Sequence, residues 1–189
     1  MIQDQIIKRG INQVELIRAF YAVDRAWFVN KGMGKGVYGD HPLPIGHKQT
    51  MSQPYIVAYM LNQLDLKKTD KVLEIGMGSG YQTALLAELV AQVYTVEVIE
   101  ALFKQTKDRL MNLNFNNIHY YLGDGYLGLK TKSPFQKIVV SCYSEDIPVN
   151  LYEQLDEGGK MILPIGNHFA QRLYLTFKEM SIPNNIYYE

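Results

Sequence analysis

Val72-Leu-Glu-Ile-Gly-Met-Gly-Ser-Gly-Tyr81 is the most informative segment of this chain for its fold. An apolar segment runs directly into glycines at positions 76, 78 and 80, and a helical segment follows. Glycine lets the backbone turn sharply and approach a ligand closely. A loop at this point lies at the carboxyl end of its strand, where open α/β sheets bind ligands. The alternative is a turn that serves only tight packing of the helix on the strand.

Alternating strands and helices surround this loop. Strands are expected over residues 71–75, 92–96, 118–121, 137–142, 161–164 and 171–177, and helices over 80–90, 100–113 and 149–155. Such alternation implies right-handed crossovers and a parallel sheet covered on both faces. The last strand follows its neighbour after a short connection, so it is expected to be antiparallel at the sheet edge. The fold class is therefore α/β, with a Rossmann-like, mostly parallel sheet.

The first 50 residues form an extension before this core. Two short helices are expected before residue 24, with Gly10 ending the first and Asn12 and Glu15 forming a capping box for the second. Glycines and prolines break any regular period over residues 25–49, which predicts a long loop that is either functional or mobile. This loop leads into a helix over 53–63. We expect one domain over 1–189, with helices and a substrate-side loop in 1–50 and the core in 51–189.

Two acidic residues follow the next two strands of the expected sheet. Glu97 comes about twenty residues after the glycine loop, where an acid can accept hydrogen bonds from both ribose hydroxyls. Asp124 lies in Gly123-Asp-Gly125, where its carboxylate can accept from an adenine amino group. The G-x-G-x-G spacing differs from the G-x-G-x-x-G of dinucleotide enzymes and suits a ligand without phosphate. Together these features predict S-adenosylmethionine (SAM) as cofactor. A solvated strand-end glutamate and a plain turn aspartate are the alternatives.

Several segments resemble the protein-L-isoaspartate O-methyltransferase family of SAM-dependent methyltransferases, roughly in register over residues 10–175. They are Pro42-Leu-Pro-Ile-Gly-His-Lys-Gln-Thr-Met-Ser-Gln-Pro54, Leu73-Glu-Ile-Gly-Met-Gly-Ser-Gly-Tyr-Gln-Thr-Ala84, Tyr94-Thr-Val-Glu97, Gly123-Asp-Gly125, Leu155-Asp-Glu-Gly-Gly159 and Leu163-Pro-Ile-Gly166. The first of these is the most specific, because many methyltransferases share only the glycine loop. The resemblance implies a seven-stranded type of sheet.

The resemblance also implies an activity, a substrate and a set of site residues. Such enzymes methylate the α-carboxyl of L-isoaspartyl or D-aspartyl residues in damaged proteins, and the ester collapses to a succinimide whose hydrolysis partly restores aspartate. S-adenosyl-L-homocysteine (SAH) is the spent product. Ser52 is the implied catalytic residue. The expected cofactor-binding residues are Thr50, Met51, Ser52, Glu74, Gly76, Met77, Gly78, Gly80, Glu97, Val98, Asp124 and Gly125. The expected substrate residues are His47, Gln49, Tyr143 and Gln171.

Methyl transfer to a carboxylate needs little acid–base help, because the nucleophile is ionised near neutral pH. Opposite charges cancel in the transition state, so a dry and aligned site is favoured. Ser52 fits as a hydrogen-bond donor to the acceptor carboxylate and not as a nucleophile. The alternative is that Ser52 is the N-cap of the next helix, or shares that role with Thr50.

The histidines and the cysteine are expected to have no catalytic or metal-binding role. His47 is expected to pack in the loop, since this chemistry needs no base. The four histidines show no ligand spacing, so no metal is expected. Cys142, the single cysteine, is expected to be a small buried hydrophobe.

The chain departs from the family pattern at four places. Gln136 replaces an aspartate, with an expected effect on a structural contact near the cofactor. Ser141-Cys-Tyr-Ser144 replaces small residues and proline, and Tyr143 is expected to reshape the acceptor pocket. Lys48 replaces a glycine and is expected to attract an acidic acceptor. Residues 181–189 lack the family's usual C-terminal strand, so that strand is expected to be truncated or absent.

Bulk composition limits the remaining possibilities. An apolar content of 47% supports a full core. Positive and negative charges balance at 19 each, which argues against nucleic acid as a partner. No apolar run is long enough to span a bilayer, and the start of the chain does not read as a signal peptide. We expect a cytoplasmic monomer or weak dimer that acts on isoaspartyl peptides or proteins. A related methyltransferase with another acceptor, or a non-catalytic SAM-binding module, is the alternative.

Overall fold

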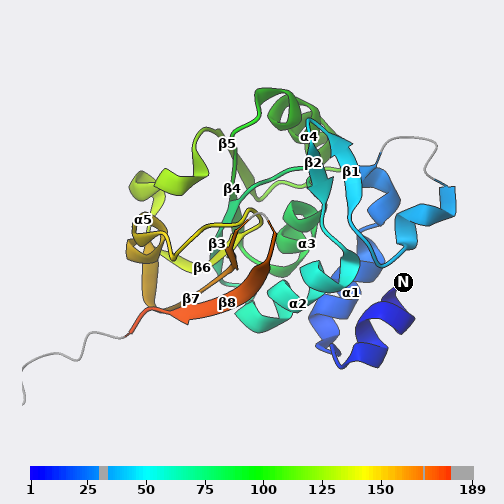
Figure 1. The fold of residues 1–189 in the computed structure, drawn as a ribbon, viewed down its shortest axis with the longest axis horizontal. Helices are drawn as coiled ribbons and strands as arrows, with labels where there is room; N and C mark the ends of the chain where they lie inside the picture. Colours follow the sequence, from blue (N-terminus) through cyan, green and yellow to red (C-terminus); the bar gives the residue numbers. More distant parts are fainter. Residues whose placement is uncertain (30–33, 168, 180–189) are drawn as a thin grey trace, which may run out of the picture.

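A computed structural model describes residues 1–29, 34–167 and 169–179, and its centre is a six-stranded sheet (Figure 1). The strand order is β5-β4-β3-β6-β7-β8. Neighbouring strands are parallel from β5 to β7, and β8 runs antiparallel to β7. The strands are β3 (Lys71–Ile75), β4 (Gln92–Glu97), β5 (Ile118–Leu122), β6 (Phe135–Val140), β7 (Leu155–Gly166) and β8 (Gln171–Phe177). The expected α/β class and antiparallel edge are confirmed. The prediction about the strand after residue 180 lies outside the described residues.

Side chains of successive strand residues enter two different cores, because they point to opposite faces of a sheet. Val72 and Val93 belong to the core that packs under α1 (Val14–Ala22), α2 (Pro54–Leu64) and α3 (Tyr81–Leu89). Their neighbours Leu73 and Tyr94 belong to the core on the opposite face, which includes Leu151 of the short helix α5 (Val149–Glu153). Helix α4 (Glu100–Asn112) packs beside β4 and β5. The sheet is therefore covered on both faces, as the alternation of elements predicts.

The N-terminal segment confirms two short helical pieces but not their expected cap. A π-helical turn (Ile2–Ile6) passes into a 3₁₀ turn (Ile7–Arg9), which ends at Gly10 with φ 91°. Helix α1 begins after Gln13, and no side chain caps it, so the predicted Asn12–Glu15 capping box is wrong. Leu16, Ala19 and Phe20 face the core, and their burial docks the helix without a cap.

The region expected to be a loop, residues 25–49, contains regular structure in its described parts. Two 3₁₀ helices, Arg25–Phe28 and Gly34–Tyr38, precede a hairpin of β1 (Leu43–Gly46) and β2 (Gln49–Met51). Gly46 pairs with Gln49, so His47 and Lys48 form a two-residue turn, with φ values of 51° and 59°. Positive φ at both positions is typical of a type I′ turn, which normally uses Asn or Gly. Alternation is too short here for the hairpin to be predicted from sequence.

Helix α2 is capped by a residue that is distant in the sequence. Its N-cap position is Gln53, which makes no side-chain capping bond, and Pro54 follows. The Asp40 carboxylate accepts from the backbone N–H of Tyr55 at 3.3 Å and forms an ion pair with Arg9 at 2.7 Å. The interpretation of Ser52 or Thr50 as the cap is therefore wrong. None of the helices in the described part of the chain is long and apolar enough to cross a membrane.

Replacing Asp40 by alanine should lower the free energy of unfolding by about 1–2 kcal/mol, because α2 loses its cap and Arg9 loses its partner. Asn at this position keeps an acceptor for the N–H group and should cost less. Asp4→Ala breaks an exposed ion pair with Lys8 and is the control, with an expected effect below about 0.5 kcal/mol. Urea unfolding measures all three. Equal stabilities of Asp40→Ala and Asp4→Ala would contradict the capping role.

Candidate active site

The glycine loop after β3 adopts a conformation that suits glycine at each of its three positions. Gly76, Gly78 and Gly80 have φ values of 90°, 54° and 88°. L-residues with a Cβ atom rarely adopt such values. The N–H groups of Gly76 and Met77 both donate to the carbonyl of Val96, at 2.9 and 3.2 Å, which anchors the turn on the neighbouring strand β4. The loop therefore follows from the residues that the sequence places there.

Side chains from outside the loop hold its next peptide groups. Glu97 accepts a hydrogen bond from the N–H of Gly78 at 2.8 Å. From helix α4, Thr106 donates to the Gly78 carbonyl at 2.6 Å and Arg109 donates to the Ser79 carbonyl at 2.9 Å. The sequence reasoning missed Thr106 and Arg109. A usable signal was present, since Thr106 is a polar residue within the buried stripe Leu102–Thr106–Leu110 of α4.

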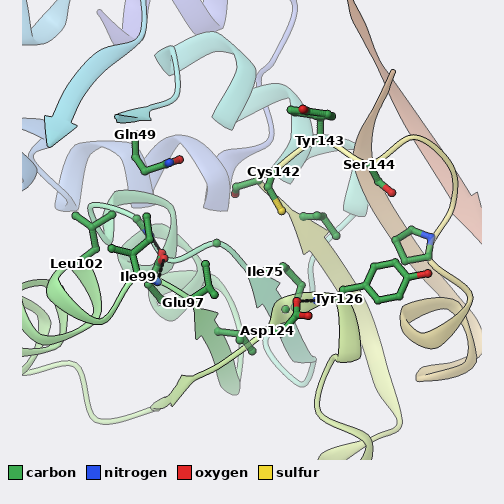
Figure 2. A pocket seen from close by; sticks show the side chains of 18 of the residues that line it. Gln49, Ile75, Glu97, Ile99, Leu102, Asp124, Tyr126, Cys142, Tyr143 and Ser144 are labelled. Atoms are coloured by element: carbon green, nitrogen blue, oxygen red, sulfur yellow. Dashed lines mark hydrogen bonds between the residues drawn. The ribbon is translucent and has the colours of Figure 1, made fainter. Parts of the chain in front are cut away.

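A cavity of about 300 Å³ opens at the carboxyl ends of β3, β4 and β6, beside this loop. Figure 2 shows Glu97 and Asp124 on one side of it and Gln49, Cys142 and Tyr143 on the other. Its apolar lining consists of Ile45, Ile75, Val96, Val98, Ile99, Leu102, Val140, Pro148 and Leu151. Gly76 and Gly78 complete the wall near Thr50. Concave, mostly apolar cavities with a few polar groups are typical of small-molecule sites.

Both predicted acids lie on this wall, and each is already held by backbone groups. The Glu97 carboxylate accepts from Gly78 on one oxygen and from the N–H of Ile99 on the other, at 2.9 Å. The Asp124 carboxylate accepts from the N–H of Tyr126 at 2.9 Å. A carboxylate has about four acceptor positions, so each can still accept from a ligand. The glycine loop and the two acids, which are far apart in the sequence, therefore line one cavity.

Glu74 does not lie where the cofactor prediction places it. Its side chain is fully buried behind the loop and does not line the cavity. Thr83 and Thr95 donate to it at 2.6 and 2.7 Å, and Gln82 donates at 3.1 Å. Gln82 also donates to Ser141 on the cavity wall, at 2.9 Å. Glu74 thus connects β3 to α3 and β4 beneath the site, so its predicted contact with the cofactor is corrected.

A second cavity of about 40 Å³ separates the Ser52 segment from the glycine loop. Thr50, Met51, Ser52 and Met77 line it. The two cavities share four lining residues, namely Thr50, Gly76, Gly78 and Ser141. Ser52 is half-buried, and its hydroxyl makes no hydrogen bond within the described residues. Ser52 therefore lines the smaller cavity, two residues after Thr50, which lines both.

Several predicted residues lie elsewhere. Gly80 lines neither cavity, and a Cβ atom there would come within 2.7 Å of Thr106, so this glycine serves packing against α4. His47 is exposed at the hairpin tip, outside both linings, and so is Lys48. Gln171 begins β8, donates to the Asn167 carbonyl and lines neither cavity. Gly80, His47 and Gln171 therefore lie outside both cavity linings, and their contacts with ligands stay predictions.

Two further interpretations change. Gln136 lies near the start of β6, at the edge of the sheet opposite the cavity, where it accepts from the N–H of Lys71 and donates to Asp156. It is therefore not near the cofactor site. Cys142 is exposed and lines the cavity, so it is not a buried hydrophobe. Strand β6 ends at Val140, two residues earlier than expected, and this leaves Ser141 and Cys142 on the cavity wall.

Burial raises the pKa of Glu74 from 4.5 to about 7, and the hydrogen bonds from Thr83, Thr95 and Gln82 lower it. The folded state therefore binds the proton more tightly than the unfolded chain does. The resulting stabilisation is complete below pH 4.5 and is lost as the pH rises through about 7.

Glu74→Gln mimics the protonated form. The stability of the wild type relative to Glu74→Gln should fall by up to about 3 kcal/mol between pH 4.5 and 8, as measured by urea unfolding. Parallel pH profiles would contradict this.

Thr106→Val removes the hydroxyl that donates to the Gly78 carbonyl and keeps the side-chain shape. The loop then loses one of its supports, so the affinity for SAH should fall about tenfold. Thr106→Ser retains the hydroxyl and should bind nearly as well as the wild type. Isothermal titration calorimetry measures both variants. Tight binding by Thr106→Val would show that the glycine loop keeps its shape without the Thr106 hydrogen bond.

Comparisons with known proteins agree with this geometry. Residues 1–185 match the family model described as protein-L-isoaspartate(D-aspartate) O-methyltransferase (PCMT). The protein-L-isoaspartate O-methyltransferase of Opitutus terrae is 44% identical over 185 residues, which cover 97% of this chain and 79% of that protein. The one from Geobacter metallireducens is 45% identical over 179 residues, covering 95% and 83%.

Solved structures give the same result. A protein-L-isoaspartate O-methyltransferase superposes with a TM-score of 0.84 at 29% identity, over 92% of this chain and 58% of that one. A Plasmodium falciparum structure described by the same enzyme name, in complex with SAH, has a TM-score of 0.78 at 25% identity and covers 91% of this chain and 86% of its own. The family match extends over nearly the whole chain and includes the glycine loop, both acids and the Ser52 segment. The chain belongs to the protein-L-isoaspartate(D-aspartate) O-methyltransferase family.

Proposed function

We propose that this protein transfers a methyl group from SAM to the α-carboxyl of L-isoaspartyl or D-aspartyl residues in damaged proteins and peptides. The methyl ester then collapses to a succinimide, and its hydrolysis partly restores aspartate. One observation carries the proposal within the family. The cavity that holds Glu97 and Asp124 meets the smaller cavity at Thr50, Gly76, Gly78 and Ser141, and Ser52 lines the smaller one.

The residues of the larger cavity fit the adenosyl group of SAM. The free acceptor positions of Glu97 suit two ribose hydroxyls, and Asp124 suits the adenine amino group. Apolar side chains such as Ile99 and Leu102 suit the faces of the base. Gly76 and Gly78 leave room for the amino-acid tail beside the loop. When bound, SAM supplies a methyl group on a positively charged sulfur.

The acceptor end is lined by neutral groups. Within the described linings of both cavities, Glu97 and Asp124 are the only charged side chains, and they lie at the adenosyl end. Gln49, Thr50 and Ser52 provide neutral hydrogen-bonding groups at the other end. These residues can orient an acceptor carboxylate by hydrogen bonding, without neutralising or repelling its negative charge. Since donor and acceptor charges cancel during transfer, a site that excludes water and aligns oxygen with the methyl group suffices.

Ser52→Ala should lower kcat about tenfold to a hundredfold, because the acceptor carboxylate loses one hydrogen bond from a hydroxyl. The affinity for SAH should change less than twofold, because the hydroxyl is proposed to contact the acceptor and not the cofactor. Thr131→Ala removes an exposed hydroxyl far from both cavities and is the control. Steady-state kinetics and calorimetry measure the two effects. An unchanged kcat would contradict the proposed hydrogen bond from Ser52 to the acceptor carboxylate.

The decisive experiment compares an isoaspartyl peptide with its normal aspartyl twin. Transfer of labelled methyl from SAM to the first, with little transfer to the second, is the expected result. Equal rates on both peptides would refute the isoaspartyl specificity. Binding of SAM with transfer to a different acceptor would favour the related methyltransferase, for which Tyr143 on the cavity wall is the motivation. Binding without turnover on any acceptor would favour a non-catalytic module.

The setting of the reaction is part of the same proposal. We infer a single-domain cytoplasmic enzyme that works as a monomer or weak dimer, on peptide and protein substrates and not on nucleic acid. A single cysteine and 19 charges of each sign support this. Size-exclusion chromatography with light scattering tests the oligomeric state.

A further inference from the structure

Arg25 is a fully buried cation without a carboxylate partner in the described part of the chain. It lies in the 3₁₀ helix Arg25–Phe28, and its relative exposure is 0%. It forms no ion pair within 4.0 Å among the described residues, although Asp40 lies close enough to favour its charged form. Burial lowers the pKa of the guanidinium, but an arginine remains charged. Burying such a group is costly unless its hydrogen bonds are used well.

The guanidinium directs its hydrogen bonds to two backbone carbonyls. Nε donates to the carbonyl of Val37 at 3.1 Å, and Nη2 donates to the carbonyl of Ser52 at 2.9 Å. Its central carbon lies 5.1 Å from the ring centroid of Tyr81, the first residue of α3 after the glycine loop. Nη1 is buried without a hydrogen-bond partner among the described residues. One planar group therefore touches the 3₁₀ helix Gly34–Tyr38, the Ser52 segment and the start of α3.

Ser52 is the residue whose carbonyl accepts the hydrogen bond from Nη2 of Arg25. It lies between the last residue of β2, Met51, and the N-cap of α2, Gln53, so it belongs to neither element. Within the described residues its hydroxyl makes no bond that would hold the side chain in place. The Arg25 hydrogen bond thus holds the backbone that carries Ser52 beside the smaller cavity.

We propose that Arg25 is a positioning residue for Ser52, acting through the Ser52 carbonyl to orient the hydroxyl toward the acceptor carboxylate. The inference rests on the proposed function. Arginine suits this role because its rigid fork can serve two carbonyls at once, whereas lysine offers a single ammonium on a flexible stem. A displacement of about 1 Å at a reacting group can cost a hundredfold in rate.

The test compares Arg25→Met, Arg25→Lys and the control Arg18→Met in the full chain. Arg18 is an exposed residue on α1 that pairs with Glu15. Arg25→Met should lower kcat on the isoaspartyl peptide about tenfold or more, with the SAH dissociation constant within about twofold of wild type. Arg25→Lys, which can reach one carbonyl, should give an intermediate kcat. Arg18→Met should match the wild type.

A second measurement does not depend on activity. Lys48 is exposed at the tip of the hairpin that ends at Met51. If Arg25 holds the Ser52 segment, brief trypsin treatment followed by mass spectrometry should show faster cleavage after Lys48 in both Arg25 variants than in Arg18→Met. Bound SAH should slow this cleavage less in the Arg25 variants than in the wild type.

The outcomes separate this inference from the proposed function. A wild type that does not methylate isoaspartyl peptides refutes the proposed function, and the cleavage rates then decide the role of Arg25. Wild-type kcat and wild-type cleavage in Arg25→Lys and a folded Arg25→Met overturn the inference. Equal losses of SAH affinity and kcat overturn it too, since they indicate general loosening. If Arg25→Met does not fold, the kcat and cleavage rate of Arg25→Lys decide between these outcomes by the same criteria.

Discussion

Both backbone polar groups of Gly78 are held by side chains, and the shape of the glycine loop depends on this arrangement. The N–H of Gly78 donates to Glu97 at the end of β4, and its carbonyl accepts from Thr106 on α4. With φ at 54°, the residue favours glycine, and the absence of a side chain brings the cavity up to the backbone. A single residue thus connects β4, α4 and the Glu97 carboxylate. Movement of any of the three would change the shape of the cavity.

Beneath the glycine loop lies a polar layer within an otherwise apolar core. Glu74 uses donors from α3 and β4, and Gln82 extends the layer to Ser141 on the cavity wall. A buried carboxyl group is costly unless its hydrogen bonds are made, and three donors surround it here. The layer therefore links the packing of α3 to the cavity wall at Ser141. Its function is support, and the residues suited to ligand contacts are Glu97 and Asp124.

The proposed acceptor side is built differently from the proposed cofactor side. The cofactor side consists of strand ends and a glycine loop, whose geometry follows from local sequence. The acceptor side consists of a small hairpin and the segment before α2, held by two side chains from earlier in the chain. Asp40 caps α2 at Tyr55, and Arg25 binds the carbonyl of Ser52. Both contacts act on backbone groups, so the residues that carry them need not touch a ligand to influence the reaction.

The α/β order, the antiparallel last strand, the glycine loop and the two acids on one edge could all be predicted from the amino-acid sequence. Each of these follows from short-range periodicity, or from the rule that carboxyl ends of parallel strands share an edge. The Ser52 segment was found through resemblance to a family. The three-dimensional packing was needed to show that Glu74 is buried, that Gln171 and His47 lie outside the cavities and that Gln136 lies at the opposite edge. Burial and orientation depend on neighbours that are distant in the chain. The contacts of Asp40, Thr106 and Arg25 span 15 to 28 residues, so a local pattern can mark Thr106 as a buried polar residue but cannot reveal which groups these side chains bind.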